Sequence, residues 1–281
     1  MPTVAEIVGA FAVGHAPNAP GEVARLGTGS EYTSLFAGVS EHLEAVDPDV
    51  IVMFDTDHFA TFFYENLPTF AVGIADHTSG PGTDRWPGLP SYDNISVEES
   101  LARLVHKEGI EQGFDLAASL EFGVDHSIVV PLHFLNPGMR RPIVPIWING
   151  IAPPMPRAKR CFDLGAMVQA AIRAWPKDLR VAVVASGSIS GDIGGPRARD
   201  HQPSAAADAA WMHQVLGRLS RGEVSELLNE ATAERIAAAG NVSGELLNWI
   251  ALLAVVGEHR PAFLESQLDA GFAYAAWRFD G

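Results

Sequence analysis

Two short apolar runs separated by one amphipathic segment open this sequence and constrain its fold most strongly. Residues 7–13 and 50–54 are of strand length and end at glycine-containing or polar turns, so we interpret them as buried strands. Between them, residues 31–46 carry apolar side chains at a helical period, and Pro48 ends the segment. Strand, helix and strand predict a βαβ unit and therefore a parallel sheet.

The alternation of strands and helices continues through the middle of the chain. Residues 143–148 and 179–185 are further apolar runs of strand length, and residues 96–112 and 161–175 have helical patterns. Pro145 lies inside one of these strands. It predicts an edge strand or a bulge, because proline has no N–H to donate to a ladder.

The remaining segments complete the prediction of an α/β fold. Glycine and proline crowd residues 73–92, which predicts a long irregular loop that shapes a site. From residue 203 onward the composition predicts a mostly helical C-terminal part, including a helix over about 243–256 behind the cap-like Asn241 and Ser243. We expect residues 1–281 to form one domain with a mostly parallel central sheet flanked by helices.

The composition favours a folded, acidic protein that does not bind nucleic acid. Of the 281 residues, 47% are hydrophobic and 19% are charged, which disfavours intrinsic disorder. Nineteen Lys and Arg face thirty-four Asp and Glu, for a net charge of −15. An acidic surface repels phosphate backbones, and no basic run with interleaved aromatic residues offsets this repulsion.

The cysteine count and the hydropathy indicate the compartment. A single cysteine, Cys161, excludes an internal disulfide and a multi-cysteine zinc site, which fits a reducing environment. The first residues carry no basic segment, and no uncharged apolar run approaches the ~18 residues of a membrane span. We therefore expect a cytoplasmic protein that does not enter a membrane.

Two histidines follow predicted strands directly. His15 and His58 each lie just past the carboxyl end of a strand, where open α/β sheets place their ligand sites. Either a structural or a ligand role fits each of them. Two imidazoles and one carboxylate form the ligand set of non-haem Fe(II) oxygenases. The residues alone do not identify that carboxylate, since Asp55 and Asp57 flank His58 on one extended segment and cannot all point inward with it.

Several short motifs, in this order, resemble those of one enzyme family. They are Gly14-His15-Ala16-Pro17, residues 54–59 with residues 62–64, Val124-Asp125-His126 before Pro131-Leu132, residues 145–150, and residues 244–249. Their order and spacing, from residue 7 to about 256, resemble the class III extradiol ring-cleavage dioxygenases. Within that family the motifs are most similar to those of the 2,3-dihydroxyphenylpropionate dioxygenases and the protocatechuate 4,5-dioxygenase β subunit.

The resemblance implies a site and a reaction. His15, His58 and Glu245 match the three iron ligands of the family, and His126 matches its substrate-facing histidine. The cofactor implied is Fe(II), and the reactants are O2 and a small catecholic or related hydroxylated aromatic compound. A weakly charged three-ligand set leaves room on the metal for both reactants. The resemblance also implies a homo-oligomer, either alone or with a small second subunit.

One departure from the family pattern concerns proton transfer. The family has a histidine in a Ser-His-Gln turn after the fourth strand, whereas this chain has Gly191 there, which cannot transfer a proton. Asp192, His201 and His126 are the candidate replacements, and His126 is preferred because the resemblance already places it in the pocket. The missing ring also leaves space for a substituted substrate.

Two other hypotheses compete with an Fe(II) dioxygenase, and two more are disfavoured. The same ligands could bind Zn²⁺ and support hydrolysis or elimination without O2. The loss of the histidine at Gly191 also fits a catalytically silent homologue with a structural or regulatory role. A nucleotide-cofactor enzyme is disfavoured, because no Gly-x-Gly-x-x-Gly follows the first strand. A serine hydrolase is disfavoured as well, because residues 187–191 lack the Gly-x-Ser-x-Gly elbow.

Overall fold

The chain folds around one large sheet. The computed structural model describes residues 4–82, 85–192 and 207–279. Its main sheet has eight strands in the order β6-β3-β7-β2-β8-β1-β10-β9, and the four central strands β7, β2, β8 and β1 are parallel. The strands of this sheet are β1 (Glu6–Val13), β2 (Val50–Asp55), β3 (Phe70–Gly73), β6 (Ala117–Ser119), β7 (Ile143–Ile148), β8 (Arg180–Ser186), β9 (Phe263–Gln267) and β10 (Phe272–Arg278). The predicted α/β fold with a mostly parallel sheet is confirmed.

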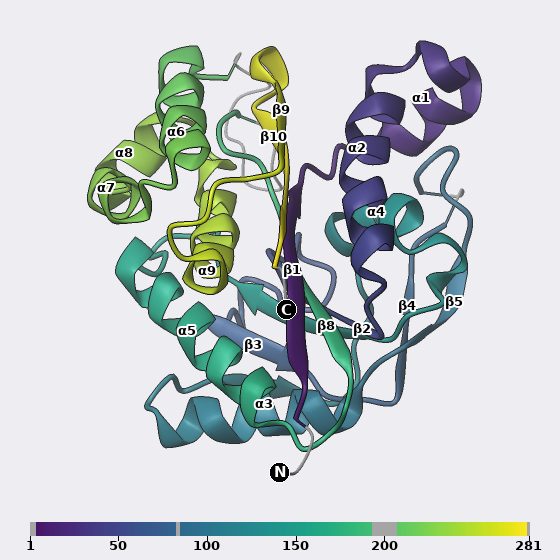
Figure 1. Cartoon of the computed structure of the whole chain (residues 1–281), viewed down its shortest axis with the longest axis vertical. Coiled ribbons are helices and arrows are strands. Elements are labelled where there is room, and N and C mark those ends of the chain that lie inside the picture. The colour runs from purple at the N-terminus through teal and green to yellow at the C-terminus, as the bar shows by residue number, and fades with distance from the viewer. Residues whose placement is uncertain (1–3, 83–84, 193–206, 280–281) are drawn as a thin grey trace.

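Helices cover both faces of the sheet. In Figure 1, α3, α5 and α9 lie on one side of β1, and α1, α2 and α4 lie on the other, with α6 to α8 above α9. The helices are α1 (Ala19–Leu26), α2 (Glu31–Val46), α3 (Glu99–Glu111), α4 (His126–Leu135), α5 (Ala158–Ala174), α6 (Ala209–Arg221), α7 (Val224–Glu230), α8 (Ala233–Ala238) and α9 (Leu246–Val256).

The sheet separates two apolar cores. Along β2, Val52 and Phe54 enter the core beneath α5 and α9, while Ile51 and Met53 enter the core beneath α2 and α4. Because successive side chains of a strand point to opposite faces, a strand covered on both faces is apolar throughout. For this reason the central strands could be predicted from short, continuous apolar runs in the sequence.

The predicted helical C-terminal part is confirmed by α6 to α9, but two strands that the sequence did not indicate follow it. Residues 263–278 form β9 and β10, and β10 pairs antiparallel with β1. Ala273, Ala275 and Trp277 face one core, whereas Tyr274 and Ala276 face the other. Since every one of these side chains is buried, the segment shows no alternation of polar and apolar residues, and its alanines resemble a helix.

Three local expectations also need correction. Residues 73–92 are not wholly irregular, because β4 (His77–Gly80) pairs with β5 (Tyr92–Ser96). Pro145 lies in an interior strand, where its missing N–H falls just beyond the ladder with β3, which ends at Ile146. The segment 243–256 begins as a 3-10 turn over residues 243–245 and becomes α-helical at Leu246, and the Ser243 hydroxyl has no partner among the described residues.

Two further observations bear on the expected compartment. Within the described ranges, no helix combines the length and apolar character needed to cross a bilayer. Cys161 is free and fully buried in α5, as a packed helix residue.

Candidate active site

Three imidazoles converge at the carboxyl edge of the parallel strands. His15 follows β1, His58 follows β2, and His126 is the first residue of α4. The ring centroid of His58 lies 5.1 Å from that of His15 and 4.6 Å from that of His126. One nitrogen of each ring lies within 4.8 Å of the others, a spacing that suits a shared metal ion. The ends of β1 and β2 and the start of α4 therefore bring together histidines that are up to 111 positions apart in the sequence.

A buried carboxylate lies beside two of these rings. Glu245 Oε1 is 3.0 Å from His58 Nε2, and Glu245 Oε2 is 3.5 Å from His15 Nε2. The Ser188 amide also donates a hydrogen bond of 2.6 Å to Oε2. The turn that carries Glu245 lies very close to the strand edge, since a Cβ on Gly244 would stand 2.0 Å from the Gly150 carbonyl oxygen. Glycine at position 244 is thus a condition for placing this carboxylate.

The charges at the Glu245 contact are those of a cation site. Burial alone would raise the pKa of Glu245, but the neighbouring His15 and His58 hold it well below its usual range. Burial alone would lower the pKa of His58, but the Asp125 and Glu245 carboxylates raise it well above its usual value. In the protein alone a proton on His58 balances the buried negative charge. A metal ion between the two Nε2 atoms and the carboxylate could replace that proton.

A second set of polar groups holds His58 from behind. Asp125 Oδ2 accepts a hydrogen bond of 2.7 Å from the His58 amide and lies 3.3 Å from His58 Nδ1. The Ser127 hydroxyl contacts both Asp125 Oδ1 and, at 2.7 Å, Asp55 Oδ2. Burial and the Asp125 charge raise the pKa of Asp55 well above its usual value, which favours a proton on Asp55, and the single Ser127 hydroxyl proton can serve only one of the two carboxylates at a time. This arrangement keeps one negative charge, on Asp125, behind His58.

Asp57 shapes the turn that follows His58. Its carboxylate accepts hydrogen bonds from the amides of Ala60, Thr61 and Phe62, at 3.0 to 3.3 Å. Three such bonds fold residues 57–62 back on themselves and keep Asp57 out of the cluster. Asp55, Asp57 and His58 thus contact different groups, because successive side chains along a strand end point in different directions.

His126 is neutral at physiological pH. Burial, together with the proximity of His58 and His15, lowers its pKa to about 3 despite the Asp125 carboxylate. The Trp86 ring lies 4.9 Å from the His126 ring and covers it from the side of the 85–89 loop. A neutral imidazole at this position can accept a proton from a bound hydroxyl group.

Of the other two proton-transfer candidates, the structure describes only Asp192. Asp192 Oδ1 accepts a hydrogen bond of 2.6 Å from the Asn241 amide, so this carboxylate supports the loop that leads to Glu245. His201 lies outside the described residues. Gly191 has a φ of 133°, which side-chain-bearing residues rarely adopt, and among the described residues a Cβ there would meet Val242 alone, at 3.7 Å.

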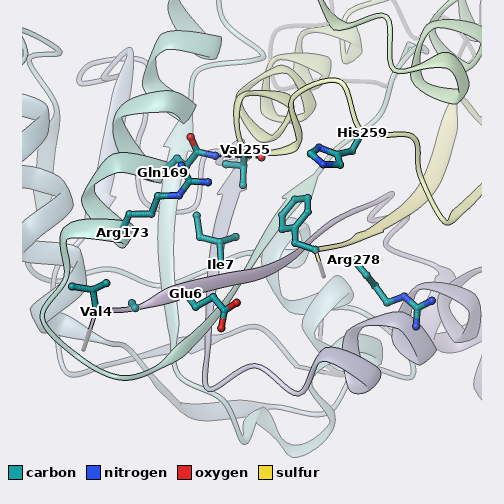
Figure 2. Close-up of a pocket in the computed structure, with 10 residues that line it drawn as sticks. Val4, Glu6, Ile7, Gln169, Arg173, Val255, His259 and Arg278 are labelled. Atoms are coloured by element: carbon teal, nitrogen blue, oxygen red, sulfur yellow. Dashed lines mark hydrogen bonds between the residues drawn. The ribbon is translucent and has the colours of Figure 1, made fainter. Parts of the chain in front are cut away.

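A broad surface pocket lies far from this cluster. It has a volume of about 610 Å³ and is lined in part by Val4, Glu6 and Ile7, at the start of β1. Figure 2 shows Arg173 and Gln169 on one side of it and His259 on another, while Arg278 points away. The cluster of His15, His58 and His126 lies beyond the opposite end of β1, so this pocket is separate from the site.

The fold and the cluster together define a doubly wound α/β protein. A buried site that could bind a metal ion lies at the carboxyl ends of its parallel strands, where such folds place their ligands. A model of the family described as the catalytic LigB subunit of aromatic ring-opening dioxygenase matches residues 9–272. The chain therefore belongs to this family, which confirms the resemblance to the extradiol ring-cleavage dioxygenases and the prediction of a dioxygenase.

Individual relatives agree with the family assignment. The chain is 26% identical to a 2,3-dihydroxyphenylpropionate/2,3-dihydroxicinnamic acid 1,2-dioxygenase of Klebsiella pneumoniae, over 89% of this chain and 85% of the relative. It is 29% identical to a protein of the same name from Mycobacterium sp. (strain MCS), over 85% and 88%. A solved structure of an uncharacterized protein from Escherichia coli K12 has the same fold, with a TM-score of 0.59 and 14% identity over 96% of this chain and 99% of that chain.

Sequence reasoning missed the residues that support the histidines. Ser186, Ser127 and Asp55 are small or short side chains without a motif of their own. One available signal was position, because Ser186 is the last residue of β8 and shares the sheet edge with His15 and His58. That signal indicates proximity to the site but not a hydrogen-bond partner.

Proposed function

We propose that this protein is an Fe(II)-dependent extradiol dioxygenase in which His15, His58 and Glu245 bind the metal. The observation that supports this most directly is the approach of two imidazole Nε2 atoms to one buried carboxylate. Two nitrogen donors and one oxygen donor, with the remaining positions open, are typical of non-haem Fe(II) oxygenases. When bound, Fe(II) would supply a common binding position for a catechol and O2, together with the redox chemistry of ring opening.

We propose that His126 is the residue that moves protons. Its neutral ring has a nitrogen lone pair that can accept a hydrogen bond from a catechol hydroxyl, and holding that proton requires the ring's pKa to rise toward the working pH once substrate is bound. Its position at the start of α4, 5.4 Å from the His15 ring centroid, keeps it beside the two proposed ligands. In this proposal His126 also takes over the role that the family assigns to a histidine at position 191.

The space beside Gly191 bears on the choice of substrate. A Cβ at Gly191 would meet one described neighbour, Val242, so the described residues do not fill the position at which the family carries an imidazole. We propose that the natural substrate is a small catechol whose ring carries an additional group. The identity of that group is left to a screen of ring compounds.

The decisive experiment is anaerobic reconstitution with Fe(II), followed by oxygen-electrode measurements with catechols, gallates and aminophenols. We expect oxygen uptake with at least one catechol, together with the yellow absorbance of a ring-opened product. The same protein loaded with Zn²⁺ should take up no oxygen. Hydrolysis or elimination by the Zn²⁺ form would support the hydrolase alternative, whereas iron binding without any turnover would support a silent homologue.

We also propose that the protein is a cytoplasmic homo-oligomer, either alone or with a small second subunit. The family resemblance supports a homo-oligomer, alone or with a small second subunit, and light scattering on the purified chain tests this directly. A cytoplasmic location is supported by the single, free Cys161. Fractionation of cells that express the protein at its natural level would test it.

A further inference from the structure

The His15 side chain has a different partner on each ring nitrogen. Nδ1 lies 2.9 Å from the Ser186 hydroxyl oxygen, and Nε2 lies 3.5 Å from Glu245 Oε2. His15 is 4% exposed and Ser186 is fully buried. A neutral imidazole carries one proton, and the nitrogen that holds it determines which nitrogen can bind a metal.

The proton of the Ser186 hydroxyl is already committed to another acceptor. Ser186 Oγ lies 2.6 Å from the Ser127 carbonyl oxygen, which can only accept. The hydroxyl has a single proton, so it donates to Ser127 and must accept from His15 Nδ1. When His15 is neutral, its proton therefore resides on Nδ1, which leaves Nε2, on the side of Glu245 and the proposed metal position, without a proton.

The groups that impose this arrangement are themselves held in place. Ser186 ends β8 directly opposite Val13 of β1, so the hydroxyl and His15 come from neighbouring paired strands. The Ser127 amide and hydroxyl are both bonded to Asp125 at the start of α4, which fixes the direction of the Ser127 carbonyl. The Asn248 amide donates to the Ser186 carbonyl oxygen, at 2.8 Å, and leaves the hydroxyl free for its role.

We propose that Ser186 is a positioning residue that fixes His15 in the Nδ1-protonated tautomer required for metal binding. This inference rests on the proposed metal site. Without the hydroxyl, Nδ1 would be a buried donor with no partner, whereas a proton on Nε2 could reach the Glu245 carboxylate. The Ser186→Ala protein should therefore favour the Nε2-protonated tautomer, which has no lone pair for the metal.

The test reads the tautomer and the metal affinity separately from catalysis. Long-range ¹H–¹⁵N spectra of the metal-free protein labelled with ¹⁵N-histidine, with His15 assigned by a His15→Gln variant, distinguish the two tautomers at about pH 8.5, where an ordinary imidazole is neutral. Anaerobic titration with Co²⁺ alone gives the dissociation constant from its absorption bands. Ser243→Ala is the matched control, because it removes a buried hydroxyl near Glu245 that has no partner among the described residues.

We expect Nδ1-protonated His15 in the wild type and in Ser243→Ala, and a shift toward Nε2 protonation in Ser186→Ala. Co²⁺ affinity should fall by roughly 10- to 100-fold in Ser186→Ala, the usual effect of losing such a supporting hydrogen bond, and stay within threefold in the control. Nε2-protonated His15 in the wild type would overturn the inference, as would a folded Ser186→Ala protein with unchanged tautomer and affinity. If the expected shifts occur but the iron form takes up no oxygen with any catechol, the inference stands and the proposed function fails.

Discussion

Replacement of Glu245 by Gln is the sharpest test of the proposed ligand set. The amide has nearly the same shape as the carboxylate and can still accept the hydrogen bond from the Ser188 amide, so the variant removes charge with little change in packing. A unit positive charge 3.0 to 3.5 Å from this carboxylate, the distance of the two histidine nitrogens, interacts with it by about 5 kcal/mol at an effective dielectric constant of ~20.

Part of that interaction is offset, because a neutral amide costs less to bury than a carboxylate. We therefore expect a net loss of roughly 3–5 kcal/mol in metal binding, as for a buried ion pair that loses one partner. This corresponds to an increase of about 10²- to 10⁴-fold in the dissociation constant. Ring cleavage should be lost with the metal, and Glu245→Ala should behave at least as severely.

The assay is the iron content of protein that has been reconstituted anaerobically and desalted, together with the Co²⁺ dissociation constant. Glu226→Gln, which changes the charge at an exposed position of α7, controls for the general effect of one lost negative charge. Full iron occupancy in a folded Glu245→Ala protein, with affinity equal to that of Glu226→Gln, would remove Glu245 from the ligand set and refute the reasoning.

Three other outcomes follow from the geometry. His126→Ala should retain its iron but lose roughly 10²-fold or more in turnover, as expected for a positioned acid or base; unchanged turnover would assign proton transfer to another group. In urea unfolding of the metal-free protein, stability should fall as pH rises from ~6.5 through the raised pKa of His58, because the folded protein keeps a proton that the unfolded chain releases. Stability should also fall as pH drops from ~6.5 to ~5, because the unfolded chain binds a proton that His126, with a pKa of about 3, does not. Glu245→Gln should flatten the alkaline limb and leave the slope between pH ~5 and ~6.5 unchanged, and an unchanged alkaline limb would contradict this. Gly191→His should lower the free energy of unfolding by about 1–3 kcal/mol, because His rarely adopts the positive φ at this position, and a lower melting temperature would report the loss. A variant as stable as the wild type would contradict the strain argument. A variant that folds, keeps iron and ranks substrates as the wild type does would contradict the substrate argument.

Residues near one another in the sequence were sufficient to predict the four central parallel strands and part of the site. The apolar runs of β1, β2, β7 and β8 reflect strands that are covered on both faces, and run length and turn residues mark where each strand ends. Since parallel strands present their carboxyl ends at one edge, His15 and His58 could be placed near one another without any structure. Glu245 and His126 entered only through resemblance to a family, because no local pattern distinguishes them from other acidic or histidine residues.

The tertiary structure decided the features that depend on contacts between distant segments. Ser186 meets His15 across 171 positions and Glu245 meets His58 across 187, and no periodicity extends over such separations. The same limit explains β10, whose alanines resemble a helix until they are seen to pack beside β1 on both faces of the sheet. The tautomer of His15 and the charges of Asp55 and His126 depend on burial and on the proton each neighbour can give or accept, and only the folded chain sets these conditions.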